Sequence, residues 1–182
     1  MISKVLKNLD VKPQIDKSVF IAKGSTLIGN IEIKKNSSIW FNCAIRADVN
    51  YIKIGEKTNI QDGTIIHVSS GGFSATGGKG YPTIIGNNVT VGHNATIHAC
   101  TIHSNSLIGM GSIILDNSVI HEYSLVAAGC LVPPNSIVKT KELWAGNPGK
   151  PIRKLRQKEL ELIDNTPLVY EKLAKEFLKK SF

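Results

Sequence analysis

The sequence of residues 102–138 reads, in blocks of six, IHSNSL, IGMGSI, ILDNSV, IHEYSL, VAAGCL, VPPNSI and V. Each block begins with Ile or Val, and the fifth residue of each complete block is Ser or Cys. A period of six fits neither the 3.6-residue period of a helix nor a simple alternation broken by turns. It is typical of a parallel β-helix, in which the aliphatic side chain fills the interior and the small one lies at a tight corner.

The same register runs upstream in three shorter blocks, so that eighteen hexapeptides begin with an aliphatic residue. Three hexapeptides make one triangular coil. We therefore expect an all-β solenoid over residues 21–140, with about six coils stacked at the ~4.8 Å strand spacing. The lead residues are Ile21, Leu27, Ile33, Ile39, Ile45, Ile54, Ile60, Ile66, Ile85, Val91, Ile97, Ile102, Ile108, Ile114, Ile120, Val126, Val132 and Val138.

The segments on either side of the repeat lack its period. We expect residues 1–20 to cap the solenoid, and residues 141–151 to form a linker because they are rich in Gly and Pro. Residues 152–182 place apolar residues among Lys and Glu at helical spacing, which predicts a C-terminal α-helix packed along the solenoid. Pro167 falls inside this pattern, and we expect it to interrupt the helix.

The composition excludes several classes of protein. The chain has 182 residues, with 22 Lys and Arg against 14 Asp and Glu, a formal net charge of +8 and 6% aromatic residues. The basic residues are not gathered with aromatic side chains, as nucleic-acid binding favours, and no apolar run approaches the ~20 residues of a membrane span. The N-terminus lacks the apolar stretch of a signal peptide, so we expect a cytoplasmic protein whose three cysteines are reduced.

Candidate functional residues gather where the period breaks. The intervals between lead residues become nine, nineteen and five, and Arg46, His67 and His98 directly follow the lead residues at these breaks. Those lead residues are the fifth, eighth and eleventh of the series, so they differ by one full coil each. We therefore expect the three side chains to stack on one face about 4.8 Å apart, where two imidazoles can converge on one metal ion.

His93 follows a lead residue of a different face and cannot easily join the other two within one chain. A trimer with closed three-fold symmetry resolves this, because the face of one subunit can meet His93 of its neighbour. Three histidines with one open coordination position are typical of catalytic zinc. Asp62 stacks one coil below His93 and can orient that imidazole. The remaining histidines, His103 and His121, are expected to be ordinary surface residues.

Short motifs accompany these residues along nearly the whole chain. They are Arg46-Ala47-Asp48, Thr58-Asn59-Ile60-Gln61-Asp62, His67, Gly92-His93, His98-Ala99-Cys100 and Gly146-Asn147-Pro148. In this order the chain resembles the gamma-class carbonic anhydrases of the hexapeptide-repeat superfamily. The resemblance implies a left-handed solenoid and a homotrimer. It also implies a metal bound by His67 and His98 of one subunit and His93 of the next, which is zinc, with Fe²⁺ or Co²⁺ as alternatives. The implied reaction is attack of metal-bound hydroxide on CO2 to give bicarbonate.

The resemblance also implies supporting roles for five residues. Gln61 would position the hydroxide or CO2, and Asn59 would support that network. Arg46, Asp48 and Asp62 would hold the subunit interface. The residues alone also allow Arg46 and Asp48 to be only a structural ion pair across subunits.

Two other functions stay open. Many hexapeptide solenoids are acyl-CoA-dependent acyltransferases that use a histidine base at a trimer interface, although such an enzyme has no use for three converging imidazoles. The excursion over residues 68–82 contains no carboxylate that could carry protons. This absence favours slow CO2 hydration, or a third function as a non-catalytic metal-binding trimer that acts as an assembly subunit.

Overall fold

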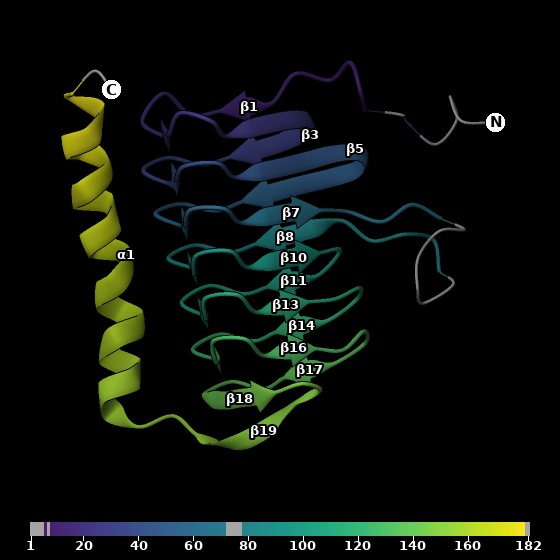
Figure 1. Cartoon of the computed structure of the whole chain (residues 1–182), viewed down its shortest axis with the longest axis vertical. Helices are drawn as coiled ribbons and strands as arrows, with labels where there is room; N and C mark the ends of the chain where they lie inside the picture. Colours follow the sequence, from purple (N-terminus) through teal and green to yellow (C-terminus); the bar gives the residue numbers. More distant parts are fainter. Residues whose placement is uncertain (1–5, 7, 72–77, 181–182) are drawn as a thin grey trace.

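The chain forms a parallel β-solenoid of about seven turns, with a helix running along its side (Figure 1). This computed structural model describes residue 6, residues 8–71 and residues 78–180. The number of turns slightly exceeds the six predicted, because strands outside the hexapeptides pair with both ends of the stack. At one end β1 (Gln14–Ile15) pairs in parallel with β3 (Thr26–Ile33), and at the other β18 (Glu142–Gly146) pairs in parallel with β15 (Leu125–Val126).

The strands of the described residues form two sheets that wrap the prism. The eight-stranded sheet supplies one face, and the eleven-stranded sheet supplies the other two because β3 and β5 (Ala44–Ile54) run continuously around a corner. The first sheet also contains β2 (Phe20–Ile21), β4 (Ser38–Ile39), β6 (Asn59–Ile60), β9 (Thr90–Val91), β12 (Leu107–Ile108) and β19 (Gly149–Lys154). The second also contains β7 (Ile65–His67), β8 (Thr83–Ile85), β10 (Thr96–His98), β11 (Thr101–Ile102), β13 (Ile113–Ile114), β14 (Val119–Ile120), β16 (Leu131–Val132) and β17 (Ile137–Val138).

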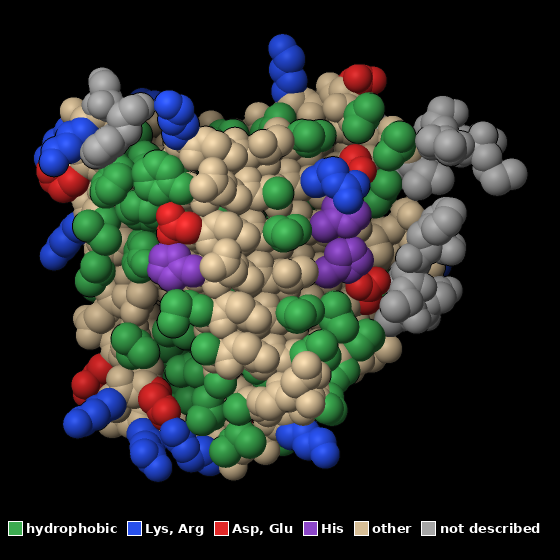
Figure 2. All heavy atoms as spheres, in the orientation of Figure 1, with side chains coloured by type: hydrophobic (Ala, Val, Ile, Leu, Met, Phe, Trp, Pro, Cys, Tyr) green, Lys and Arg blue, Asp and Glu red, His purple; other side chains and the backbone are tan. Residues whose placement is uncertain are grey.

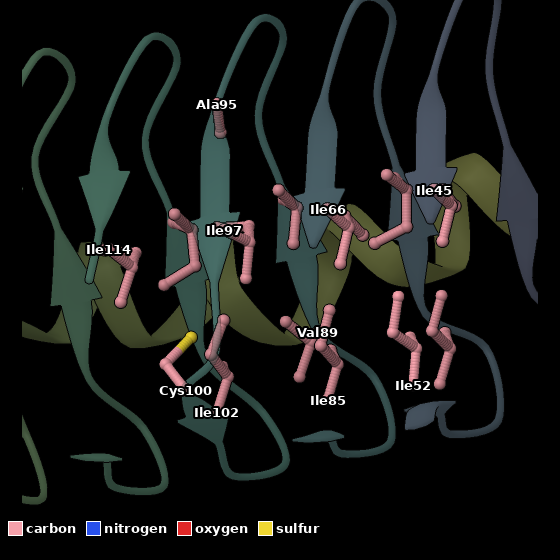
Figure 3. Packing of buried hydrophobic residues seen from close by; sticks show 14 of the residues in the cluster. Ile45, Ile52, Ile66, Ile85, Val89, Ala95, Ile97, Cys100, Ile102 and Ile114 are labelled. Atoms are coloured by element: carbon pink, nitrogen blue, oxygen red, sulfur yellow. The ribbon is translucent and has the colours of Figure 1, made fainter. Parts of the chain in front are cut away.

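The predicted lead residues fill the interior. Apart from Ile21 and Leu27, which lie in the first coil at the open end of the lumen, each is at most 2% exposed. Figure 3 shows the labelled aliphatic side chains of successive strands pointing into this interior as a continuous row. Burying each of these side chains stabilises the fold by roughly 1.5–3 kcal/mol. The three cysteines, Cys43, Cys100 and Cys130, are buried and unpaired.

A close approach of two backbones explains the bend in β3. Gly29 has φ +90°, and a Cβ there would lie 2.4 Å from the carbonyl oxygen of Ala47 in β5. The pairing of β3 with β5 shifts register next to this residue, between Gly29 and Ile31. Because only glycine tolerates both the positive φ and the contact, it lets the two long strands turn the corner together.

The segment expected to be a linker, residues 141–151, is instead largely a hairpin, since β18 pairs antiparallel with β19. Its Trp144 is 8% exposed and stacks in register on Val126, so this side chain closes the lumen. Gly and Pro predicted a departure from the coil, but they did not reveal that an indole would be drawn to the open apolar end.

The N-terminal segment lies across the first coil where it is described. Besides the pairing of β1 with β3, the backbone N–H of Asn8 donates to the carbonyl of Asp48 at 3.0 Å. The prediction of a cap over residues 1–20 covers residues 1–5 and 7, which lie outside the described residues.

Helix α1 (Gln157–Leu178) continues through Pro167, so the predicted interruption is wrong. The helix packs on β2, β4, β6 and β9, and Pro167 itself is buried. Packing of this whole face offsets the one backbone hydrogen bond that proline removes. Among the described residues, no helix is both long and apolar enough to cross a bilayer.

Candidate metal centre

The strand register brings three of the predicted site residues into one row. Arg46 of β5 pairs with His67 of β7, and His67 pairs with His98 of β10. Each follows an inward-facing isoleucine, so each points outward along the same edge. Figure 2 shows this face, with histidine side chains gathered at one edge below a basic side chain. The stacking predicted from the spacing is confirmed, whereas the role of these residues as ligands stays a prediction.

The two imidazoles face each other with a separation that suits a metal ion. Nδ1 of His67 lies 3.2 Å from Nε2 of His98, and the ring planes are inclined at 48°. Two nitrogens bound to one tetrahedral zinc at about 2.0–2.1 Å lie roughly 3.3 Å apart. The pair therefore fits two positions of such a site without a change in the distance between the nitrogens.

Each imidazole has a buried carboxylate on its other nitrogen. Nε2 of His67 lies 3.1 Å from Oδ1 of Asp48, and Nδ1 of His98 lies 2.5 Å from Oδ1 of Asp116. Both carboxylate side chains are at most 6% exposed. A carboxylate accepts a hydrogen bond from the ring nitrogen that carries the proton, so each carboxylate directs the ring proton outward from the pair. The two inner nitrogens then both present lone pairs, an arrangement that a cation between them stabilises.

The sequence reasoning missed Asp116, although the same counting could have found it. Ile97 and Ile114 are in register on adjacent coils, and Asp116 lies two residues after Ile114. Asp62 likewise lies two residues after an inward residue, Ile60, on the coil next to that of His93. A carboxylate on the far side of His98 was therefore visible in the repeat.

Arg46 and Asp48 form an ion pair within one chain. An ion pair of these residues across subunits stays a prediction. Arg46 lies above the histidine row, and Asp48 is placed between its guanidinium and His67. Burial alone would raise the pKa of Asp48, but hydrogen bonds from His67 and Arg46 outweigh it and lower that pKa. Burial lowers the pKa of His67, because it disfavours the charged ring. Asp48 opposes this effect, while the charge of Arg46 adds to it, and the net shift is downward. Both shifts favour an ionised carboxylate beside a neutral imidazole, the form that binds metals.

His93 lies apart from this pair, as predicted. It follows β9 in the other sheet, and its Nδ1 lies 2.8 Å from Oδ2 of Asp62, which confirms the predicted contact. Over residues 8–71 and 78–180, no group of three His, Cys, Asp or Glu side chains of one chain is placed to hold a metal. That His93 of a second copy of the chain completes a site with His67 and His98 stays a prediction.

Asn59 and Gln61 lie on the His93 side of the subunit and form a hydrogen-bonded chain. Nε2 of Gln61 donates to Oδ1 of Asn59 at 3.1 Å, and Nδ2 of Asn59 donates to Oγ1 of Thr90 at 2.9 Å. Both amides are at most 5% exposed. Within one chain they do not meet His67 and His98. The predicted site residues thus form two groups on separate edges of the prism.

The other two histidines form a pair of a different kind. His103 and His121 also follow inward residues of adjacent coils, and their rings are stacked 5.2 Å apart at 5°. No carboxylate forms an ion pair with either ring in the part of the chain that the structure describes. They lie half-buried on the surface, where they were predicted to be ordinary surface residues.

Comparisons with known proteins place the fold and the site in context. The model of the bacterial transferase hexapeptide family (six repeats) matches residues 99–134. The chain is 48% identical to a protein of Methanocaldococcus jannaschii named "Probable carbonic anhydrase", over 88% of this chain and 95% of that one. It is 45% identical to the mitochondrial gamma carbonic anhydrase 2 of Arabidopsis thaliana, over 91% of this chain and 58% of the relative.

Among solved structures, a hexapeptide transferase family protein from Anaplasma phagocytophilum superimposes with a TM-score of 0.83 at 40% identity, covering 91% of this chain and 92% of that one. The chain spans only 58–63% of the lengths of three Arabidopsis relatives that it matches. Part of each plant protein is therefore unmatched by this chain.

Proposed function

The chain belongs to the gamma carbonic anhydrase family, and on this premise we propose that it hydrates CO2 to bicarbonate at metal sites shared between the subunits of a homotrimer. The observation that carries the proposal is the pair of facing imidazole nitrogens, 3.2 Å apart, each ring backed by a buried carboxylate. Aliphatic packing alone has no need of this arrangement, and imidazoles that bind a metal commonly have such a carboxylate on the other ring nitrogen.

In the proposed site His67 and His98 of one subunit and His93 of its neighbour hold the metal, with one coordination position open. Zinc suits three imidazoles, and Fe²⁺ or Co²⁺ suit them as well. When bound, such an ion supplies Lewis acidity that brings the pKa of a coordinated water toward neutrality. The protein's own contribution is to orient the three rings and to fix which nitrogen of each carries the proton. Asp48, Asp62 and Asp116 each accept a hydrogen bond from one of them.

Gln61 is proposed to orient the reactants. Its amide nitrogen donates to Oδ1 of Asn59, whose own amide nitrogen donates to Thr90. These hydrogen bonds fix the orientation of both side-chain amides. The carbonyl oxygen of Gln61 is thereby left as an acceptor for a proton of the attacking water, and the second N–H of its amide is left to polarise an oxygen of CO2. Because Gln61 directly precedes Asp62, which contacts His93, it is proposed to enter the shared site together with that histidine.

The proton released in each turnover is proposed to leave through buffer. Residues 68–82, between β7 and β8, contain no carboxylate. Without an internal acceptor that can ionise at neutral pH, transfer to a small base in solution limits the rate. We therefore expect CO2 hydration to accelerate with buffer concentration over a wide range.

The proposal is tested by metal analysis and stopped-flow CO2 hydration on the purified protein. We expect about one transition-metal ion per subunit and activity that rises with buffer. His93→Ala is expected to lose both, whereas the surface variant His121→Ala is expected to keep both. A metal-free wild-type protein would overturn the proposal. Metal-bound protein that is inactive even at high buffer would favour a non-catalytic assembly role instead.

Acyl transfer is the second candidate, and the similarity to a hexapeptide transferase family protein supports it. Such an enzyme needs a histidine base but no metal. Turnover of acetyl-CoA by the chelator-treated protein, unaffected by loss of metal, would favour it over CO2 hydration.

A further inference from the structure

The molecule contains two histidine pairs built on the same scaffold, and they differ in ring geometry. In each pair the rings follow inward isoleucines of adjacent coils, and in each the ring centroids are 5.2 Å apart. His67 and His98 are inclined at 48° with two nitrogens 3.2 Å apart. His103 and His121 are nearly parallel, at 5°. The coil spacing is therefore sufficient to stack two imidazoles, but it does not by itself turn their nitrogens toward a common point.

The difference between the pairs lies in the carboxylates. Asp48 and Asp116 contact the outer nitrogens of His67 and His98, one on each side of the pair. Asp116 lies two residues after the inward residue on the coil that follows His98. The equivalent position for His121 is Thr140, two residues after the inward Val138 of the next coil. Thr140 is exposed and has no charge to attract the ring. The stacked pair thus serves as an internal reference for what the same backbone does without a carboxylate.

The two carboxylates lie on opposite sides of the pair. Asp48 contacts both His67 and the guanidinium of Arg46. Asp116 contacts Nδ1 of His98, and its side chain is 5% exposed. A buried carboxylate keeps its charge only where donors compensate it, and the N–H of His98 is such a donor.

We propose that Asp116 is the positioning residue that fixes the tautomer and tilt of His98, and so converts a stacked imidazole pair into two metal ligands. With the proton held on Nδ1, Nε2 of His98 presents its lone pair toward Nδ1 of His67. The inference rests on the proposed function, because it takes His67 and His98 to hold a metal. It adds a residue that neither the spacing of the histidines nor the motif resemblance assigned.

The first test reads the tautomer directly in the metal-free protein and needs no activity. The protein is labelled with ¹⁵N-histidine and its long-range ¹H–¹⁵N spectrum is recorded at about pH 8, where imidazoles are neutral. We expect His98 to carry its proton on Nδ1 in the wild type. This preference should weaken in Asp116→Asn and vanish in Asp116→Leu, which offers no acceptor. His121 supplies the reference in every spectrum. A wild-type His98 protonated on Nε2 would overturn the inference.

The second test measures Co²⁺ affinity by competition with a chelator, together with the visible spectrum of the bound ion. Loss of a group that orients a ligand lowers metal affinity roughly 10- to 100-fold, and we expect this fall for Asp116→Leu with a smaller one for Asp116→Asn. Asp164→Asn, an exposed carboxylate on α1, is the matched control and should bind as the wild type does.

The outcomes separate the inference from the function on which it rests. Wild-type affinity and an unchanged cobalt spectrum in both Asp116 variants would overturn the positioning role and leave the proposed function intact. A wild-type protein that binds no Co²⁺ would overturn the proposed function, while the tautomer measurement would still decide whether Asp116 fixes His98. Asp116→Asn keeps the volume of the carboxylate, so it tests the inference even if Asp116→Leu does not fold.

Discussion

At the scale of single residues, the site depends on the alternation of inward and outward side chains along each strand. The hexapeptide repeat allows these positions to be counted from the sequence. His67 and His98 could be placed together from sequence because each follows an inward residue one coil apart, and the ladder leaves no freedom in that register. The 48° inclination of their rings could not be predicted, since it depends on side-chain torsions that the period does not encode. The direction of the Arg46 side chain was likewise outside the reach of the pattern, so its pairing within the chain was not foreseen.

A second residue-scale feature explains the shortened interval between Ile97 and Ile102. Most non-glycine residues at positive φ in the described part of this solenoid are Asn, but here Ala99 adopts φ +50°. It is fully buried, and its N–H lies 3.0 Å from both the carbonyl of His67 and Oγ1 of Thr83. The tight corner thereby joins the two histidine-bearing strands directly to each other.

We expect Ala99→Val to destabilise the protein by about 2 kcal/mol or more, because a β-branched side chain is strained at positive φ and this site has no room for it. Ala99→Gly is the control and should lie within about 1 kcal/mol of the wild type, since relief of the strained φ offsets the lost methyl group. Urea unfolding of both variants measures the difference. Equal stability of the valine and glycine variants would show that the corner is not under steric constraint.

At the scale of elements, helix α1 is tied to the solenoid at both ends. Near its start, Glu159 accepts two hydrogen bonds of 2.7 Å from the guanidinium of Arg153 in β19, and these lower the pKa of Glu159 to about 2. Near its end, Phe177 packs against Trp40 and Phe20, with ring centroids 5.2 and 5.6 Å apart. The helix and its amphipathic face could be predicted from sequence. Its continuity through Pro167 could not, because it comes from packing against strands far away in the chain.

Phe177→Ala is expected to loosen the end of α1 from the solenoid. Removing a ring from this aromatic cluster costs about 2–3 kcal/mol, because the space it leaves is lined by other rings that cannot fully close in. The neighbouring Leu178 is 52% exposed, so Leu178→Ala should change stability by less than about 0.5 kcal/mol. Hydrogen exchange of the α1 amides measures both. Protection that falls equally in the two variants would contradict the anchoring role of the cluster.

At the scale of the whole molecule, the repeat predicted the architecture and the ends departed from it. Eighteen hexapeptides predicted six coils, and the additional turn comes from pairings at the ends that have no hexapeptide signature. The candidate ligands lie on different edges of one prism, with His67 and His98 on one and His93 on another. Which edges meet between subunits is a matter of association, and the single chain does not contain it.

Sharing of sites between subunits predicts that two defective variants complement each other. When His98→Ala and His93→Ala subunits are co-expressed in equal amounts, about a quarter of the interfaces combine an intact His67–His98 pair with an intact His93. We expect mixed trimers, isolated through two different affinity tags, to regain metal at one of their three interfaces, which is about a third of the wild-type content. Co-expressed His98→Ala and His67→Ala subunits, damaged in the same half-site, should regain none. Failure of the first mixture, with mixed oligomers present, would contradict the shared site.

The double attachment of α1 has a consequence for how such a chain can change length in evolution. An inserted coil would lengthen the solenoid by ~4.8 Å, while each residue of helix spans about 1.5 Å. Because Arg153 contacts the start of the helix and Trp40 contacts Phe177 near its end, the helix must grow by roughly three residues for every coil inserted. That is close to a full helical turn, so the apolar stripe keeps nearly the same orientation. Proteins that descend from this fold should therefore gain or lose coils and helical turns together.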